Sequence, residues 1–396
     1  MLVTEACGCP QRRAVCAART LRRAAIATIF YSLAGEGRGH ATRVRALVER
    51  LRVAHRVVLF TSDDALELLA PRYAEASGVE VRAIPGLKFH YRDSRIDLAA
   101  TIWQGVTVYL RNLRRLVASL AESIQSERPD LVVTDFEPAL PRAAHRSGVP
   151  VLSVDHQHFL LAYDLSSLPL RLRLRAAAMA QVVRMYGIEP DGTVVSAFYR
   201  PPLRRGWERT VQVGPFLRPE ILSARPREGD YLLSYLRPAT PPSVLSLLKR
   251  AGRPVRIYGL GARPATGSLT FCPIDEQRFV ADLAGCAGLI AAAGNQLLGE
   301  ALYFGKPVLA LPEAHHHEQQ INAHFIREMG CGDAVRLDRL TARDIERFVA
   351  RRAEFAPGLA QVAGRIDGTE QALAEIERFV AAAPARPSTT ACAPRP

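Results

Sequence analysis

The chain has 396 residues, of which 48% are hydrophobic and 23% are charged, and its formal net charge is +13 at pH 7. This length exceeds what one hydrophobic core usually supports, so we expect two domains, and no run approaches the roughly 20 apolar residues that a membrane-spanning helix requires. Arginine carries nearly all of the positive charge, because Lys88, Lys249 and Lys306 are the only lysines. This fits either GC-rich codon usage or a functional basic surface.

The seven cysteines show no paired C-x-x-C spacing. This argues against a zinc site or a disulfide framework and favours a reducing cytoplasm. We expect residues 1–23 to be a disordered extension or to precede the true start codon. The Ala/Pro-rich residues 384–396 are expected to form a disordered tail.

The predicted elements of the first half alternate between short buried strands and amphipathic helices. In chain order the strands are residues 24–33, 55–62, 79–86, 129–138, 149–159, 192–198 and 210–221, with helices from residue 41, from residue 64, over 98–127 and over 168–186. Such alternation is typical of βαβ units around a parallel sheet.

A second alternating series follows the polar bend at residues 223–230. Its strands are predicted at 231–236, 253–259, 288–294 and 306–313, with helices over 242–251, after residue 277, over 295–305 and from residue 318. The chain is therefore predicted to be an α/β protein of two Rossmann-like domains, residues 24–218 and 219–383. In such sheets ligands bind beyond the carboxyl ends of the strands.

The most specific chemical signal lies in residues 293–332. Gly294 and Asn295 end a predicted strand and open a helix, so unpaired amides and the positive end of the helix dipole can hold a phosphate. Glu300 lies about a turn and a half further on, where a carboxylate can accept hydrogen bonds from ribose hydroxyls. Glu318 and Gln319 begin a later helix and can present a carboxylate and an amide to sugar hydroxyls.

This block resembles the donor-binding signature of GT-B glycosyltransferases that use nucleoside-diphosphate sugars. The shared features are Gly294 with a glutamate six residues later, the segment GKPVLALP and the string EQQINA. The earlier run GRGHATR, residues 37–43, is similar to the first glycine loop of the bacterial and archaeal branch of that superfamily, with the pattern G-x-G-H-x-x-R. The resemblance implies a GT-B fold, in which two Rossmann-like domains face each other across a cleft.

The resemblance also implies a set of donor contacts from both halves: Gly37, Gly39, Gly294, Asn295, Gln296, Glu300, His317, Glu318 and Gln319. The glycines of the first loop would let the backbone approach the phosphate and sugar. The donor is expected to be a UDP- or dTDP-sugar, with no cofactor. Ala292 departs from the pattern, because relatives often have histidine there, so phosphate binding is expected to depend on backbone amides and on an arginine that the sequence does not identify.

His40 and Asp135 are the candidate catalytic pair. A neutral imidazole, whose unperturbed pKa is about 6.5, is suited to take a proton from an attacking hydroxyl. Asp135 ends the strand in LVVTDFEP and matches the acid that orients the base histidine in related inverting transferases, where a carboxylate fixes the tautomer. The alternative is that His40 only caps its helix and Asp135 only begins a turn.

Two other clusters resemble metal sites, but we assign no metal. The three consecutive histidines at 315–317 lie on one predicted loop, and adjacent residues rarely converge on one ion. The resemblance implies metal-independent catalysis, with His317 near the sugar. Asp63 and Asp64 precede a helical pattern and are expected to cap it.

The acceptor side is predicted to lie in the first domain, with candidate contacts at Phe89, His90, His156 and His158. Trp103 is expected to pack in the core, and a hydrogen-bonded loop cluster is an equally open role for the two later histidines. The acceptor is expected to be a hydroxyl compound, either a small natural product or a lipid-linked molecule. The basic stretch RLRLR at 171–175 could place the protein at the inner face of the membrane.

The sequence therefore predicts an inverting, metal-independent glycosyltransferase of the cytoplasm. The alternatives are a nucleotide-sugar 2-epimerase of the same fold, which would release an epimer without an acceptor, and a donor-binding protein without catalysis. No zinc finger, aromatic RNA-binding motif or recognition helix in the sequence points to specific binding of nucleic acid.

Overall fold

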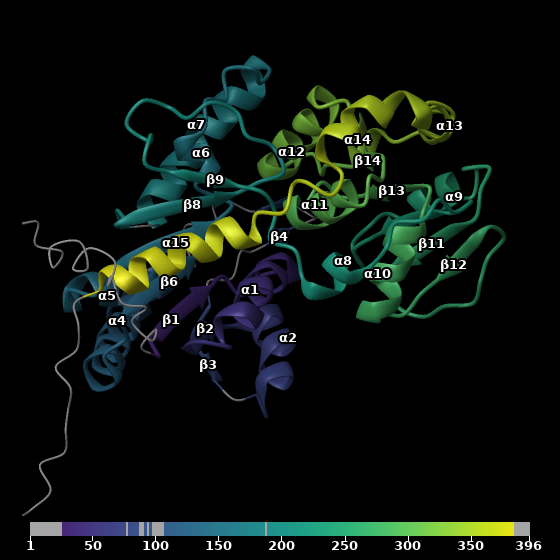
Figure 1. Cartoon of the computed structure of the whole chain (residues 1–396). Coiled ribbons are helices and arrows are strands. Elements are labelled where there is room, and N and C mark those ends of the chain that lie inside the picture. The colour runs from purple at the N-terminus through teal and green to yellow at the C-terminus, as the bar shows by residue number, and fades with distance from the viewer. Residues whose placement is uncertain are drawn as a thin grey trace, which may run out of the picture.

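The computed structural model describes residues 26–76, 78–86, 91–92, 95–96, 107–186 and 188–383. Within these residues the chain forms two larger parallel sheets, one in each half of the molecule, with helices packed against them (Figure 1). The prediction of two Rossmann-like halves is confirmed. A short antiparallel pair, β4 (Tyr91–Arg92) and β5 (Arg95–Ile96), lies outside these sheets.

The first sheet has seven strands in the order β3-β2-β1-β6-β7-β8-β9. Their bounds are β1 (Thr28–Leu33), β2 (Arg56–Thr61), β3 (Val79–Ala83), β6 (Leu131–Asp135), β7 (Val151–Asp155), β8 (Gly192–Ser196) and β9 (Val211–Val213). The helices of this half are α1 (Arg38–Leu51), α2 (Asp63–Tyr73), α4 (Thr107–Glu127), α5 (Ala139–Ser147), α6 (Phe159–Ala162) and α7 (Leu170–Tyr186). The order of the strands reverses at β1, which lies between β2 and β6.

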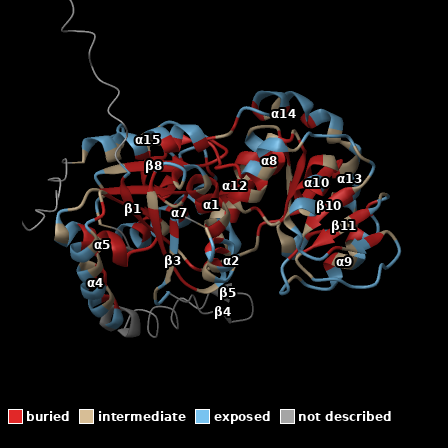
Figure 2. Cartoon of the chain, turned by 60° about the horizontal axis from the view of Figure 1, so that its bottom comes forward, coloured by how far each residue is buried: buried red, intermediate tan, exposed pale blue. Residues whose placement is uncertain are grey.

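The central strand β1 is buried along its whole length, and its side chains alternate between two cores. Ile29, Tyr31 and Leu33 pack in a cluster with α1, whereas Phe30 packs in a second cluster with α4 and α5. This alternation follows from the two-residue period of a strand. Helices therefore cover both faces of the sheet, and the strands form the red, buried layers of Figure 2.

The second sheet has six strands in the order β12-β11-β10-β13-β14-β15. Their bounds are β10 (Leu232–Tyr235), β11 (Val255–Tyr258), β12 (Leu269–Phe271), β13 (Gly288–Ala291), β14 (Val308–Ala310) and β15 (Gly332–Ala334). The helical segments are α8 (Pro219–Ser223), α9 (Ser243–Leu248), α10 (Glu276–Gly285), α11 (Asn295–Tyr303), α12 (His317–Glu328), α13 (Ala342–Ala350), α14 (Ala356–Val362), α15 (Thr369–Ala382) and the short η3 (Leu337–Arg339) and η4 (Arg352–Phe355).

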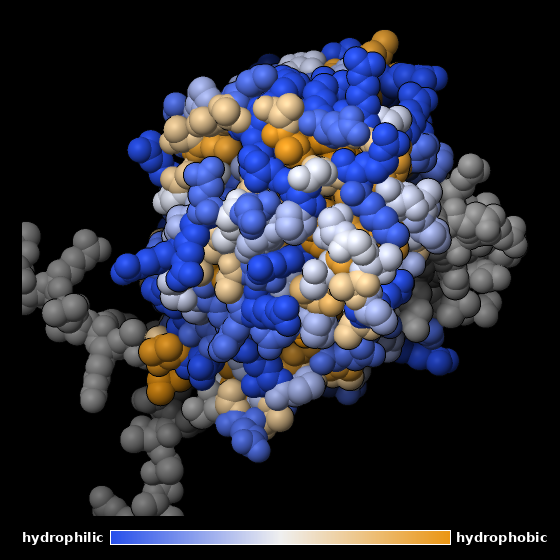
Figure 3. All heavy atoms as spheres, turned by 90° about the vertical axis from the view of Figure 1, so that its right-hand side faces the viewer, coloured by the Kyte–Doolittle hydropathy of each residue, from blue (hydrophilic) through white to orange (hydrophobic). Residues whose placement is uncertain are grey.

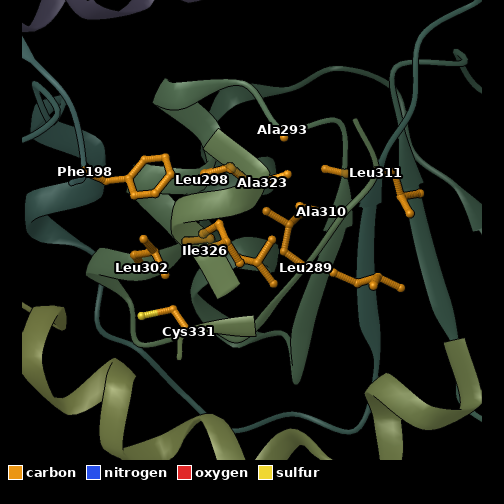
Figure 4. Packing of buried hydrophobic residues seen from close by; sticks show 14 of the residues in the cluster. Phe198, Leu289, Ala293, Leu298, Leu302, Ala310, Leu311, Ala323, Ile326 and Cys331 are labelled. Carbon is orange, nitrogen blue, oxygen red and sulfur yellow. The ribbon is translucent and has the colours of Figure 1, made fainter. Parts of the chain in front are cut away.

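The two halves are in direct contact. Phe198, which follows β8, points toward α11, from which Leu298 and Leu302 project (Figure 4), and all three belong to one buried cluster. The last helix, α15, returns to the first sheet, where Ala372 and Ile376 pack in the same cluster as β1 (Figure 1). We predicted that residues 219–383 form the second half. Helix α15 belongs to this range in the sequence, but it packs against the first sheet.

The surface of the second half is mostly hydrophilic, with scattered apolar side chains (Figure 3). Among the described helices, none combines the length and the apolar composition that crossing a bilayer requires.

Candidate active site

The loop after β1 contains three glycines, at 35, 37 and 39, and each has a different environment. A Cβ atom at Gly35 would collide with Ser62, and Gly37 has a φ of +79°, which favours glycine. The amide of Gly37 donates to Asp64 Oδ2 at 3.0 Å. A Cβ at Gly39, in contrast, would meet no described atom within 4 Å. The protein's own packing thus does not require glycine at position 39, whereas the close approach of a ligand would.

Helix α1 begins in this loop with unsatisfied amides. Its N-cap is Gly37, no described side chain caps its first turn, and that turn contains no acidic residue. We expected Asp63 and Asp64 to cap the following helix, but Ser62 is the N-cap of α2, and Asp64 instead holds the loop through Gly37. The positive end of α1 is therefore available to an anion.

His40 lies in the first turn of α1 and faces Asp135 at the carboxyl end of β6. The loop and the aspartate are brought together because Leu33 pairs with Asp135 in the parallel sheet. His40 Nδ1 lies 3.1 Å from Asp135 Oδ1, and the side chain of His40 is 15% exposed, whereas Asp135 is fully buried. The predicted pair is thus in contact, with its imidazole open to a ligand.

Arg43 fixes the carboxylate from the next turn of α1. Its Nε donates to Asp135 Oδ2 at 2.6 Å, and its Nη2 contacts Oδ1. Burial by itself raises the pKa of Asp135, but the charges of Arg43 and His40 outweigh burial and lower this pKa below its ordinary value. Asp135 therefore remains ionised at neutral pH.

Gln157, which follows β7, contacts the other side of the imidazole. Arg43 Nη2 donates to Gln157 Oε1 at 3.2 Å, which turns the amide nitrogen toward His40 Nε2 at 3.4 Å. The Asp135 carboxylate accepts from a protonated Nδ1, whereas Arg43 Nη2, which lies 2.8 Å from the same nitrogen, can only donate to it. The tautomer of His40 therefore depends on which of these two contacts is made. Nε2 is the ring nitrogen that points away from Asp135, toward Gln157.

The donor loop of the second half begins α11 in a similar way. Gly294 is the N-cap, no described side chain caps the helix, and a Cβ at Gly294 would meet no described atom within 4 Å. The side chain of Asn295 is buried and bonded to the first half, accepting from Phe198 N at 3.3 Å and donating to Ser196 O at 3.1 Å. Phosphate contacts at this loop would thus come from backbone amides.

Glu300 is buried and already paired. Arg218 donates to its two carboxylate oxygens at 3.1 and 2.8 Å, and Gln296 Nε2 donates to Oε1 at 3.1 Å. A carboxylate accepts about four hydrogen bonds, so acceptor capacity for ribose hydroxyls remains. Arg218 also pairs with Glu276 on α10, which in turn pairs with Arg45 of α1. The network places a buried arginine beside the predicted nucleotide site.

Glu318, at the start of α12, faces the first half. Its Oε1 lies 3.7 Å from His156 Nε2. Burial raises the pKa of Glu318, but the charges of His156, His316, Arg43 and His40 together lower it. Glu318 thus lies beside His156 of the first half, and its predicted contact with the sugar stays a prediction.

The other predicted donor residues of α12 have separate surroundings. Gln319 is buried and its Oε1 accepts from Glu313 N at 2.9 Å. His317 is partly buried, and burial lowers its pKa. His316 is the N-cap of α12 and accepts from Gln319 N at 3.4 Å. Among the described residues, no group of three or more His, Cys, Asp or Glu side chains is placed to hold a metal ion.

Of the four predicted acceptor residues, two lie in the described part of the chain and two lie outside it. Phe89 and His90, like Trp103, lie outside the described residues. His156 is fully buried, donates from Nδ1 to Ser196 O at 2.8 Å and turns Nε2 toward Glu318. It therefore has no exposed edge for an acceptor in this arrangement.

His158 lines a small cavity between the sheet and α7, together with Phe136, Glu137, Asp155 and Val183. Its Nδ1 lies 2.5 Å from Asp155 Oδ2, which also accepts from Ser153 Oγ at 2.6 Å. Burial raises the pKa of Asp155, but His158 and the hydrogen bonds outweigh it and lower the pKa to about 2. We considered a hydrogen-bonded loop cluster as the alternative role of His158. Its contacts with Asp155 and Ser153 fit this alternative.

Sequence reasoning missed three residues of this site. Arg43 was visible as the last residue of the G-x-G-H-x-x-R pattern, one helical turn after His40, but no role was assigned to it. Gln157 stands between the two histidines that were singled out. Arg218 carried no signal, because its contacts depend on how the two halves meet.

The two parallel sheets of Rossmann type match the fold of GT-B glycosyltransferase structures. Solved structures share this fold. The glycotransferase of kitacinnamycin superposes with a TM-score of 0.65 at 16% identity, covering 89% of this chain and 99% of that one. CalG4, the calicheamicin glycosyltransferase, gives 0.64 at 20% identity with 90% and 98% covered, and LpCGTa in complex with UDP gives 0.63 at 18% identity with 90% and 100% covered.

Residues 27–352 match Glycosyl transferase family 1, and the chain belongs to this family. An uncharacterized glycosyltransferase of Methanosarcina mazei is 26% identical over 327 residues, which is 77% of this chain and 84% of the relative. One from Methanosarcina acetivorans is 26% identical over 352 residues, with 80% and 85% covered. The protein is a glycosyltransferase.

Proposed function

We propose that this enzyme is an inverting, metal-independent glycosyltransferase that moves a sugar from a UDP- or dTDP-sugar to a hydroxyl group. The observation that carries the proposal is the orientation of His40. Asp135 lies 3.1 Å from its Nδ1, so Nε2 points away from the carboxylate, and the charge of Glu318 of the other half acts on the same site.

The residues support a single displacement. His40 Nε2 takes the proton of the acceptor hydroxyl, the oxygen forms a bond to the anomeric carbon, and the bond from that carbon to the diphosphate oxygen breaks. Asp135 stabilises the imidazolium that results. The leaving diphosphate meets the amides at the start of α11.

Two acceptor classes remain within the proposal, a small natural product and a lipid-linked molecule. The likeness to CalG4, named as the calicheamicin glycosyltransferase, is one of fold and does not choose between these classes. The proposal places the reaction in the cytoplasm, including the surface of its membrane.

The test is the stereochemistry of the product. We expect NMR of the glycoside formed from a UDP- or dTDP-sugar to show the anomeric configuration opposite to that of the donor. Retention of configuration would contradict direct displacement. Release of an epimerised nucleotide sugar without any acceptor would instead support the 2-epimerase alternative.

Metal independence has its own test. Because the amides at the start of α11 provide the positive end of a helix dipole for the diphosphate, turnover in excess EDTA is expected to stay within about twofold of the untreated value. A complete loss that Mg²⁺ or Mn²⁺ restores would contradict this part of the proposal and direct attention to the histidines at 315–317.

A further inference from the structure

Helix α7 carries an unusual concentration of exposed apolar side chains. Leu170 is 60% exposed, Leu174 63% and Met185 79%. With Val182, these make four of the eight large hydrophobic residues that are exposed in the described part of the chain. Single exposed apolar residues are ordinary, but a group of them on one helix indicates an interaction surface.

These side chains lie on the face of α7 that points away from the protein. Ala176, Ala180 and Val183 pack in the large buried cluster on the opposite face. At 100° per residue, Leu170, Leu174 and Met185 fall within about 60° of one another around the helix axis. The helix thus has two apolar faces, one in the core and one in solvent.

Arginines flank the exposed apolar stripe on both sides. By the same helical geometry, Arg171 and Arg175 lie along one edge and Arg173 and Arg184 along the other. All four are exposed, and none forms an ion pair with a described residue. The helix contains no acidic residue.

The neighbouring acidic residues that the structure describes do not pair with the arginines of α7. Glu328 of α12, which accepts from Ser167 Oγ at 3.4 Å, pairs with His324 at 2.9 Å. Asp164 precedes α7 and accepts from the amide of Ser166. The four guanidinium groups of α7 therefore present an excess of positive charge around an apolar stripe.

We propose that α7 docks the first half of the enzyme on an anionic lipid surface. An apolar stripe between two cationic edges is the form of helices that lie in the membrane interface, with leucines among the acyl chains and arginines at the phosphate groups. The core of a protein–protein contact would instead be depleted in charged residues. Since no described helix is suited to span a bilayer, the contact is peripheral.

Helix α7 belongs to the first half, which is predicted to bind the acceptor. Docking through α7 would bring this side of the first half close to the lipid headgroups. This step rests on the proposed function and favours the lipid-linked class of acceptor.

The experiment uses the full chain and vesicles without donor or acceptor, so that it does not depend on the proposed function. Co-sedimentation is measured with phosphatidylcholine vesicles and with vesicles containing about one third phosphatidylglycerol. We expect binding to the anionic vesicles only, weakened by high salt. The triple variant L170S/L174S/M185S and the variant R171E/R175E are each expected to lower the bound fraction about tenfold.

The matched control is V53S/I274S, which removes exposed apolar side chains elsewhere and is expected to bind like the wild type. Circular dichroism spectra that are unchanged in all variants show that each is folded. Equal vesicle binding by the triple variant would assign the affinity to other basic segments and overturn the proposal. Self-association that the triple variant abolishes, without vesicle binding by the wild type, would also overturn it in favour of a protein contact.

Discussion

At the scale of single residues, the ion pair between Arg43 and Asp135 sets the chemistry of His40. A carboxylate behind a catalytic imidazole stabilises the charged ring. Here the same carboxylate is also neutralised by a buried guanidinium, which keeps it ionised and fixes its orientation. In the proposed mechanism Arg43 acts through Asp135 and Gln157, which it contacts, and is therefore a positioning residue.

The pair makes a prediction about stability. Arg43→Met leaves Asp135 buried without its cation, so we expect a loss of about 3–5 kcal/mol in the free energy of unfolding at neutral pH. In the variant, burial raises the folded-state pKa of Asp135 above its unfolded value, so stability declines as pH rises past that value. In the wild type this pKa is lowered. The difference between the two proteins should therefore shrink toward pH 4.

Denaturant unfolding at about pH 7 and pH 4.5 measures this difference. Arg50→Met is the matched control, because Arg50 lies on the same helix and its pair with Glu370 is exposed. That variant should lose at most about 1 kcal/mol. An equally small cost for Arg43→Met, or a cost independent of pH, would contradict the assigned role.

At the scale of elements, the starts of α1 and α11 were predictable, because glycine at a strand-to-helix turn has few explanations. Gly39 and Gly294 stand in open space, so no local packing demands them. The course of α15 was not predictable. Its apolar face shows that it packs against something, but only the tertiary structure shows that Ala372 and Ile376 belong to the first sheet's core. The contact of His156 with Glu318 could not be predicted from the sequence either, because it too forms only when the two halves meet.

The turn after β7 provides a pH prediction. Asp155 has a pKa of about 2, below its ordinary 3.8, so its contribution to stability is present above pH 3.8 and is lost as pH falls toward 2. Burial lowers the pKa of His158, but Asp155 outweighs burial and raises it above 6.5, so that contribution is lost as pH rises beyond this value. The pair should stabilise the fold most between about pH 4 and 6.5.

Asp155→Asn tests this window. The difference in unfolding free energy between wild type and variant is expected to be largest near about pH 5 and smaller near pH 3 and pH 8. Asp230→Asn removes an exposed aspartate and serves as the control. A difference that is constant across this range would show that the Asp155–His158 pair does not titrate as described.

At the scale of the whole molecule, a chain of ion pairs crosses from one half to the other. Arg45 of α1 pairs with Glu276 of α10, which pairs with Arg218, which pairs with Glu300 of α11. No single segment of sequence could reveal this chain, because its members come from four separate elements. The chain of ion pairs links Glu300, which is predicted to bind the ribose, to the contact between the two halves.

Two variants separate ribose binding from this structural role. Glu300→Ala is expected to weaken UDP and dTDP binding by roughly 1–3 kcal/mol, because it removes the acceptor of ribose hydroxyls. Glu276→Ala breaks the same chain at a residue without a predicted nucleotide contact, so it should change affinity far less. Calorimetry measures both. Equal losses would mean that the network, and not a ribose contact, accounts for the effect of Glu300.

The central claim is that His40 is the base of the transfer, and the most direct test is the turnover of His40→Ala with one donor and one acceptor. We expect turnover to fall by roughly 100-fold to 10,000-fold, the usual contribution of a positioned proton acceptor. The affinity for the free nucleotide should stay within about twofold, since residues of the second half are predicted to bind it. His145→Ala, which removes an exposed histidine of α5, should retain wild-type turnover. Near-wild-type turnover of His40→Ala would contradict base catalysis by this residue.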